Sequence, residues 1–340
     1  MTAMSLEIIG ITVLWLFLYG YLIVASIDFG AGFFAYYARV SKKEHIMSKL
    51  ISRYLSPVWE VTNVFFVFFF VGLVGFFPDT AYYYGTALLL PGSVAIILIA
   101  IRGSFYAFGN YGSKDSTLYL FLYGATGLLI PASLSTALTI SEGGYLREDE
   151  NGVTFLAGEL FTSPYSWSVV FLAIVSVLYI SASFLTYYAD RAEDYDSRAI
   201  MRKFALFWGA PTIIASLMVF AGLRSHNGEH FERALDLWWM FGLSLVFFLI
   251  AGYLIFKKKN YGTAFLMVML QFFFAFFGYG ASHLPYILYP FITVEGSVVN
   301  ETMGIALVTV FILGLCLLIP SLYLLMRLFL FDADYVKGKK

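Results

Sequence analysis

The chain has 340 residues, of which 60% are hydrophobic and only 13% are charged. A soluble domain carries about a quarter of its residues as charged side chains, so a water-exposed surface is excluded for most of this protein. The formal net charge of -1 gives no indication of nucleic-acid binding, and the single cysteine, Cys316, excludes an internal disulfide.

Apolar runs along the chain are long enough to cross about 30 Å of hydrocarbon, which takes about 20 helical residues. The runs cover residues 8–37, 57–77, 83–111, 118–140, 167–188, 204–223, 237–256, 263–288 and 303–331. The first run follows only one charged residue, Glu7, and is too long for the core of a cleaved signal peptide, so we expect it to be retained. The sequence therefore predicts an all-α integral membrane protein of about nine transmembrane helices.

Lysine and arginine residues predict the sidedness of these helices, because short cytoplasmic loops retain positive charge. Alternate loops and the C-terminal tail hold most of them, namely Arg39, Lys42, Lys43, Lys49, Arg53, Lys114, Arg191, Arg198, Arg202, Lys203, Lys257, Lys258, Lys259, Lys337, Lys339 and Lys340. The other loops carry only Arg147, Arg224 and Arg233, and the largest of them is acidic. We therefore expect the N-terminus outside the cell and the C-terminus in the cytoplasm.

A faint internal repeat predicts how the helices are grouped. Ala35-Tyr36-Tyr37-Ala38 recurs as Thr186-Tyr187-Tyr188-Ala189, and Pro57 has a counterpart in Pro211, each about 150 residues later. Because each half holds four spans, such a repeat is parallel. We expect a four-helix bundle over residues 1–140, an exterior loop over 141–166, a second four-helix bundle over 167–290, and a peripheral C-terminal helix with a cytoplasmic tail over 300–340.

Three ionisable residues fall inside predicted spans, where a charge needs a partner, a water-filled cavity or a function. Asp28 lies eleven residues before Arg39, about 16 Å from the cytoplasmic end of the first span. Glu60 lies in the opening turn of the second span, and Arg102 lies in the cytoplasmic third of the third. Their shared position favours a proton path from the cytoplasm, with Asp28 and Glu60 as carriers and Arg102 as a counter-ion.

A purely structural role is open for each of these residues. Asp28 would then only hydrogen-bond a neighbouring helix, and Arg102 would extend its charge to the membrane interface. Glu60 would be an acid favoured by the helix dipole, because Ser56 and Pro57 make a good helix start.

The histidines give weaker signals. His226, Glu229 and His230 match the H-x-x-E-H string of zinc peptidases, but the Asn-Gly pair after His226 interrupts the helix that such a site requires. His283 is the only histidine in a predicted span, so the chain lacks the ligand pairs that several haems need. We therefore expect no metal site, no catalytic residue and no cofactor bound by this chain alone.

Several motifs resemble subunit II of bd-type quinol oxidases. They are Ile27-Asp28-Phe29-Gly30-Ala31-Gly32, Ser56-Pro57-Val58-Trp59-Glu60, Arg102-Gly103 and Pro285-Tyr286-Ile287-Leu288. The resemblance implies a non-haem subunit that pairs with a haem-bearing subunit I, which holds haem b and haem d, oxidises quinol and reduces dioxygen to water. It also implies a multi-pass protein of a bacterial or archaeal cell membrane, and it allows a structural quinone and a small single-helix subunit.

In this family the acid after the tryptophan belongs to a proton channel, a role that would fall on Glu60 with Trp59 in support. Asp28 and Arg102 match the family's first-helix aspartate and third-helix arginine. The chain departs from the family pattern where Ala107 and Gly109 replace a second acid and a second arginine. The resemblance therefore predicts a variant proton route.

Two other functions are compatible with acids inside the membrane. A proton-coupled secondary transporter or channel would suit a parallel repeat, but the second half has no intramembrane acid that matches Asp28 or Glu60. A structural scaffold for another membrane subunit differs from the oxidase interpretation only in whether Glu60 matters for turnover.

Overall fold

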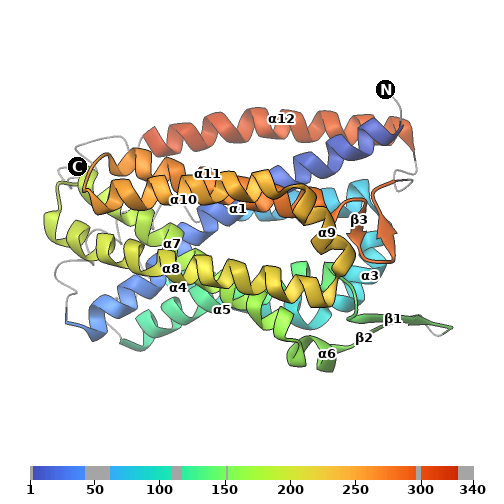
Figure 1. The fold of residues 1–340 in the computed structure, drawn as a ribbon, viewed down its shortest axis with the longest axis horizontal. Helices are drawn as coiled ribbons and strands as arrows, with labels where there is room; N and C mark the ends of the chain where they lie inside the picture. Colours follow the sequence, from blue (N-terminus) through green and yellow to red (C-terminus); the bar gives the residue numbers. More distant parts are fainter. Residues whose placement is uncertain (1–2, 43–61, 109–116, 151, 296–299, 328–340) are drawn as a thin grey trace.

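The computed structural model describes residues 3–42, 62–108, 117–150, 152–295 and 300–327. Trp59 and Glu60, together with Ser56 and Pro57, lie outside the described residues. The long helices run along the longest axis of the molecule, and α12 follows one edge (Figure 1). The longer helices are α1 (Ala3–Val40), α4 (Leu89–Phe108), α5 (Thr117–Ser141), α7 (Pro164–Arg191), α8 (Tyr195–His226), α10 (Trp238–Phe256), α11 (Tyr261–His283) and α12 (Glu301–Met326).

The number of spans differs from the expected nine. Among the described residues, seven helices are long and apolar enough to cross a membrane, namely α1, α5, α7, α8, α10, α11 and α12. An eighth is reached if α3 (Asp79–Ala87) and α4 form one bent span, and a shorter apolar helix covers Thr62–Phe76. The all-α membrane fold is confirmed, and the described residues contain seven or eight spans by length and composition.

Two of the predicted spans do not run straight through. In the run over 83–111 the chain bends by 77° between α3 and α4, and Pro91 lies in the opening turn of α4, where a missing N–H is tolerated. In the run over 263–288 the helix ends at His283, because Pro285 disfavours a helical conformation in the residue before it. Residues 286–288 form strand β3 (Tyr286–Leu288), which pairs antiparallel with β4 (Ile292–Thr293).

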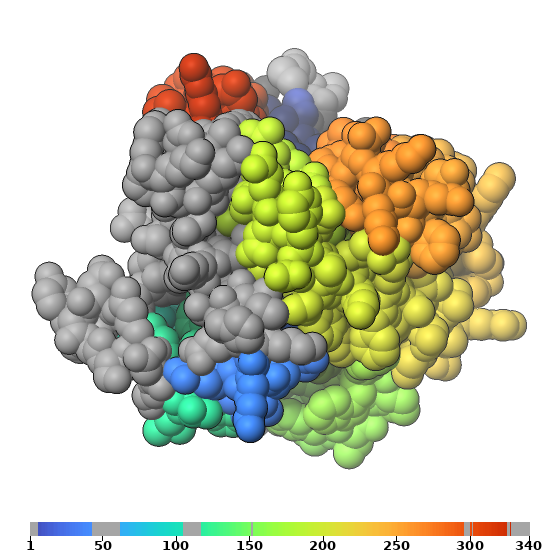
Figure 2. Space-filling view, turned by 90° about the vertical axis from the view of Figure 1, so that its left-hand side faces the viewer, coloured from blue at the N-terminus to red at the C-terminus, as the bar shows by residue number. Residues whose placement is uncertain are grey.

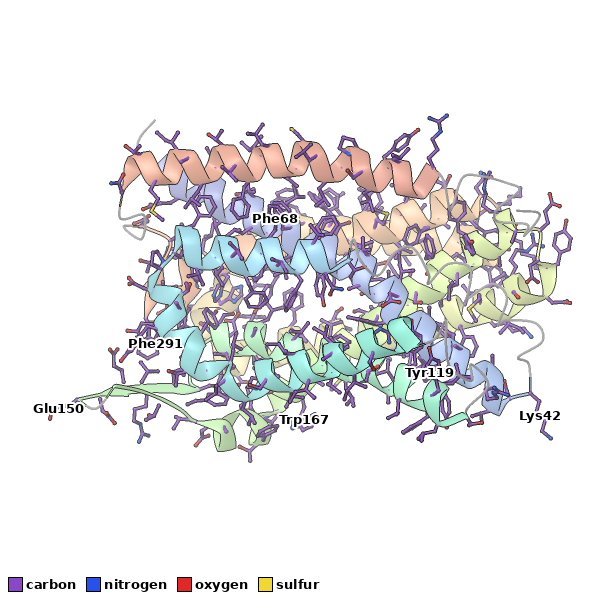
Figure 3. All side chains as sticks on the ribbon, turned by 180° about the vertical axis from the view of Figure 1, so that it is seen from behind. Lys42, Phe68, Tyr119, Glu150, Trp167 and Phe291 are labelled. Atoms are coloured by element: carbon purple, nitrogen blue, oxygen red, sulfur yellow. The ribbon has the colours of Figure 1, made fainter. Side chains whose placement is uncertain are left out.

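The predicted exterior loop over 141–166 is ordered into short elements. Strands β1 (Leu146–Asp149) and β2 (Gly152–Phe155) form an antiparallel hairpin, and α6 (Ala157–Thr162) follows. Figure 3 places Glu150, at the tip of this hairpin, at the opposite end of the molecule from Lys42, which follows α1. The acidic loop and the first basic loop therefore begin at opposite ends of the helices.

The basic end of the molecule is formed by connections between helices. Figure 2 looks onto this end, where the α7–α8 connection, the α10–α11 connection and the end of α1 come together. Arg202 on α8 donates hydrogen bonds of 2.7 Å each to the carbonyl oxygens of Ile255 and Phe256 at the end of α10. This contact joins α8 to the end of α10 at the basic end of the molecule.

Buried apolar side chains form two large clusters, and α1 contributes to both. One cluster joins α1 to α7, α8, α10 and α11, and includes Phe34. The other joins α1 to the Thr62–Phe76 helix, α5 and α12, and includes Phe17. Helix α1 therefore packs between the two predicted groups of helices, while the parallel repeat and the division at residues 140 and 167 stay predictions.

Candidate functional site

The charged residues predicted within the first and third spans meet in the structure. Arg102 on α4 places its Nε 3.0 Å from Oδ2 of Asp28 on α1, and both side chains are 1% exposed. A buried ion pair of this kind removes two charges from water together, so that each charge is compensated by the other. The pair links α1 to α4, and α5 packs against both of these helices.

The remaining donors around this pair are also used. Arg102 donates from Nη1 to the carbonyl oxygen of Tyr123 and from Nη2 to that of Asp28, each at 2.8 Å. The Tyr123 hydroxyl on α5 donates to Oδ1 of Asp28 at 3.1 Å. The guanidinium carbon also lies 3.9 Å from the centre of the Tyr123 ring, a cation–π contact. Three helices are thereby joined by one polar cluster, which we call the Asp28 cluster (Asp28, Arg102 and Tyr123).

Glycines allow the helices around the Asp28 cluster to approach closely. A Cβ atom added to Gly32 would lie 2.9 Å from the carbonyl oxygen of Tyr123, and one added to Gly127 would overlap the carbonyl group of Phe29. A Cβ atom on Gly30 would lie 2.9 Å from the Val177 carbonyl oxygen on α7. The glycines of the first-span motif therefore serve helix packing, as small residues do in membrane bundles.

The structure thus brings Asp28 and Arg102 together, while Glu60 and Trp59 fall outside the described residues. Sequence reasoning did not single out Tyr123, the third member of the cluster. Its signal in the sequence is slight, since the chain has 25 tyrosines. The neighbouring Gly124 and Gly127 on α5 mark a face for close helix contact, and that is the only local hint of its position.

A second polar cluster lies at the opposite end of the helices, where the acidic hairpin emerges. It consists of Glu142, His230 and His283, and all three are buried. Nδ1 of His230 lies 2.9 Å from both carboxylate oxygens of Glu142, and Nδ1 of His283 lies 3.4 Å from Oε1. We call these residues the Glu142 cluster. Sequence reasoning had treated Glu142 as one acid of an exterior loop.

The surroundings of Glu142 favour its ionised form. Asn227 donates from Nδ2 to Oε2 at 3.1 Å, and the Tyr279 hydroxyl donates a hydrogen bond to Oε1. Burial alone would raise the pKa of the Glu142 carboxyl, but the contacts with His230 and His283 outweigh it and hold the pKa well below its usual range. Glu142 is therefore a buried carboxylate anion.

The H-x-x-E-H string does not assemble as a metal site. His226 ends α8, whereas His230 lies on α9 (Gly228–Asp236), with Asn227 as the cap between them. The His226 ring stacks between Tyr145 and Tyr165, with ring centres 5.1 and 5.0 Å apart. The predicted break of the helix is confirmed, but its continuation is a second helix, and His230 turns to Glu142 and His283 instead.

Comparisons with known proteins were made over the whole chain. The sequence profile described as cytochrome bd terminal oxidase subunit II matches residues 6–329. The putative cytochrome bd menaquinol oxidase subunit II of Bacillus subtilis strain 168 is 32% identical over 343 aligned residues, covering 98% of each protein. A chain of the bd oxidase structure from Geobacillus thermodenitrificans is 58% identical, with a TM-score of 0.86, and the match covers 96% of this chain and 99% of that one.

Proposed function

Because the chain belongs to the cytochrome bd terminal oxidase subunit II family, we propose that it carries protons from the cytoplasm to the oxygen-reducing site of its partner. Membership makes the chain a multi-pass membrane subunit of a bd-type quinol oxidase, whose haems are in subunit I. The proposed function is to support the reduction of dioxygen to water there. That reaction consumes protons, so a polar route through apolar helices is required.

The observation that carries the proposal is the Asp28 cluster. A hydroxyl group and a carboxylate in hydrogen-bond contact, with Tyr123 Oη 3.1 Å from Asp28 Oδ1, offer a step for proton transfer inside the bundle. Arg102 compensates the charge of Asp28 and holds the carboxylate in place. In this scheme Glu60 takes up the proton first, with Trp59 beside it in the sequence, and Asp28 with Tyr123 forms a later polar step.

The direction of the path follows from the distribution of charge. We propose that the basic end shown in Figure 2 faces the cytoplasm and that the N-terminus lies outside. Asp28 is eleven residues before Arg39 on α1. It therefore lies past the midpoint of this helix, in the half that we propose faces the cytoplasm. Quinol oxidation is assigned to the partner subunit, and a structural quinone and a small single-helix subunit remain expectations from the family.

The test replaces Glu60 by Gln in the purified two-subunit complex and measures oxygen consumption with quinol. We expect turnover to fall by about two orders of magnitude, the usual cost of losing a proton-transfer group, while the haem absorption spectrum stays that of the wild type. Glu229→Gln is the matched control, because its side chain is 63% exposed on α9, near the hairpin end of the molecule. Wild-type turnover of Glu60→Gln, with intact haem bands, would leave only a scaffold role.

A further inference from the structure

The Glu142 cluster plays no part in the proposed proton path, and its donor atoms converge as metal ligands do. One donor atom from each of Glu142, His230 and His283 lies within 4.8 Å of the others. Ligands at about 2.0–2.1 Å around a tetrahedral Zn²⁺ lie about 3.3 Å from one another. The distances of 2.9 Å and 3.4 Å from Glu142 to the two imidazole nitrogens are close to that spacing.

The hydrogen bonds of His230 fix which ring nitrogen faces the carboxylate. The Ser282 hydroxyl donates to the carbonyl oxygen of Tyr279 at 2.9 Å, so its oxygen accepts from Nε2–H of His230 at 2.7 Å. In the neutral imidazole the lone pair of Nδ1 then points at the two oxygens of Glu142. Such an approach is repulsive unless a proton or a metal cation lies between the groups.

The surroundings of His283 favour a metal cation over a proton between His230 and Glu142. Its Nδ1 lies 3.4 Å from Oε1 of Glu142, but neither ring nitrogen has hydrogen-bond geometry with a described residue, although the residue is only 8% exposed. A proton shared by His230 and Glu142 would leave Nδ1 of His283 with only this long contact in a buried site, which is costly. A divalent cation bound by one donor atom from each side chain gives Nδ1 of His283 a partner and removes the repulsion between His230 and Glu142.

We propose that Glu142, His230 and His283 bind a divalent transition-metal cation, and that Zn²⁺ is the ion this donor set fits best. Two imidazoles and one carboxylate are zinc ligands of a familiar kind, and they leave one coordination position open. Ser282 orients His230 in the way that an outer hydrogen-bond partner orients a metal-bound imidazole.

The ion would join three separate parts of the chain. Glu142 follows α5, His230 lies on α9 and His283 ends α11, so a bound cation clamps these helices together near the hairpin end. Direct contacts already join these parts. Among them, Arg233 on α9 donates from Nε to the Ser282 carbonyl oxygen at 2.8 Å.

The test is the zinc content of the purified two-subunit complex, measured by mass spectrometry after incubation with Zn²⁺ and removal of excess ion by a weak chelator. We expect one equivalent of zinc per complex in the wild type, and its loss in His283→Ala and Glu142→Gln. His226→Gln is the matched control, because that histidine lies nearby but outside the cluster, and it should retain the zinc. Ser282→Ala should weaken zinc binding by about 10–100-fold, because it releases the orientation of His230.

The haem spectrum and size-exclusion profile of each variant show whether it is assembled, so that His283→Ala remains informative if Glu142→Gln does not fold. A wild-type complex that retains no zinc after incubation would overturn the proposal. Equal zinc in the wild type and in an assembled His283→Ala complex would overturn it too, because the ion would then be adventitious.

Discussion

The two buried polar clusters differ in how completely their charged and hydrogen-bonding groups are paired within the chain. In the Asp28 cluster, the Arg102 guanidinium and the Tyr123 hydroxyl supply donors to one carboxylate, and the charges of Asp28 and Arg102 cancel. In the Glu142 cluster, a carboxylate faces two imidazoles, and the nitrogens of His283 have no hydrogen-bond partner among the described residues. The charges of the first cluster are compensated within this chain, whereas we propose that the second cluster binds a cation.

The largest expected effect comes from breaking the complete cluster. Arg102→Met leaves the Asp28 carboxylate buried without its counter-ion, and we expect a loss of about 3–5 kcal/mol in the free energy of unfolding. Thermal unfolding of the complex in detergent measures this loss. The control is Arg198→Met, because the Arg198–Asp190 pair has side chains that are 27% and 37% exposed and should contribute about 0–1 kcal/mol.

A double variant sharpens this prediction. Replacing Asp28 by Asn together with Arg102→Met removes both charges, so much of the stability lost in the single variant should return. If Arg102→Met alone were as stable as the wild type, the compensation of Asp28 by Arg102 would be refuted.

A smaller effect is expected from the close helix contact beside the same cluster. Gly127→Ala forces α5 away from the carbonyl group of Phe29, and we expect a loss of about 1–3 kcal/mol by thermal unfolding. Gly242→Ala on α10 is the control, because no atom lies within 4 Å of an added Cβ there. Equal unfolding temperatures for the two variants would show that the packing of α5 on α1 is looser than described.

The smallest effect is the difference between two helix caps, one of which contacts the Glu142 cluster. Asn227 caps α9 by accepting from the His230 N–H and also donates to Glu142. Asn227→Ala should therefore lower the free energy of unfolding by about 2 kcal/mol. Asn300 caps the exposed start of α12 in the same way and makes no contact with a charge in the described structure, so Asn300→Ala should cost about 0.5–1 kcal/mol. The reverse order of unfolding temperatures would contradict the electrostatic part of this difference.

The fold was largely predictable because hydropathy is a local property of the chain. Apolar runs predicted the positions of α1, α5, α7, α8, α10, α11 and α12. Hydropathy carries no information on the direction of the helix axis, so the bend between α3 and α4 was not predicted. Pro285 indicates the end of α11 in the sequence, but the apolar run continues past it, so the predicted span was too long.

The candidate sites were predictable only in part. Asp28 and Arg102 stand out because a charge inside an apolar run is costly wherever it points. Glu142, His230 and His283 are separated by 88 and 53 positions and sit at the ends of helices, where polar residues are ordinary. Only the packing of α5, α9 and α11 brings them together, and sequence reasoning weighed a different trio, so the expectation of no metal site stays a prediction.

The proposed proton path is tested most directly by following proton uptake during oxygen reduction, with the two-subunit complex in lipid vesicles and a pH indicator on its cytoplasmic side. We predict that the wild type takes up protons from that side with each turnover and that Glu60→Gln loses this uptake together with its oxygen consumption. Undiminished uptake and oxygen consumption by Glu60→Gln would contradict the account.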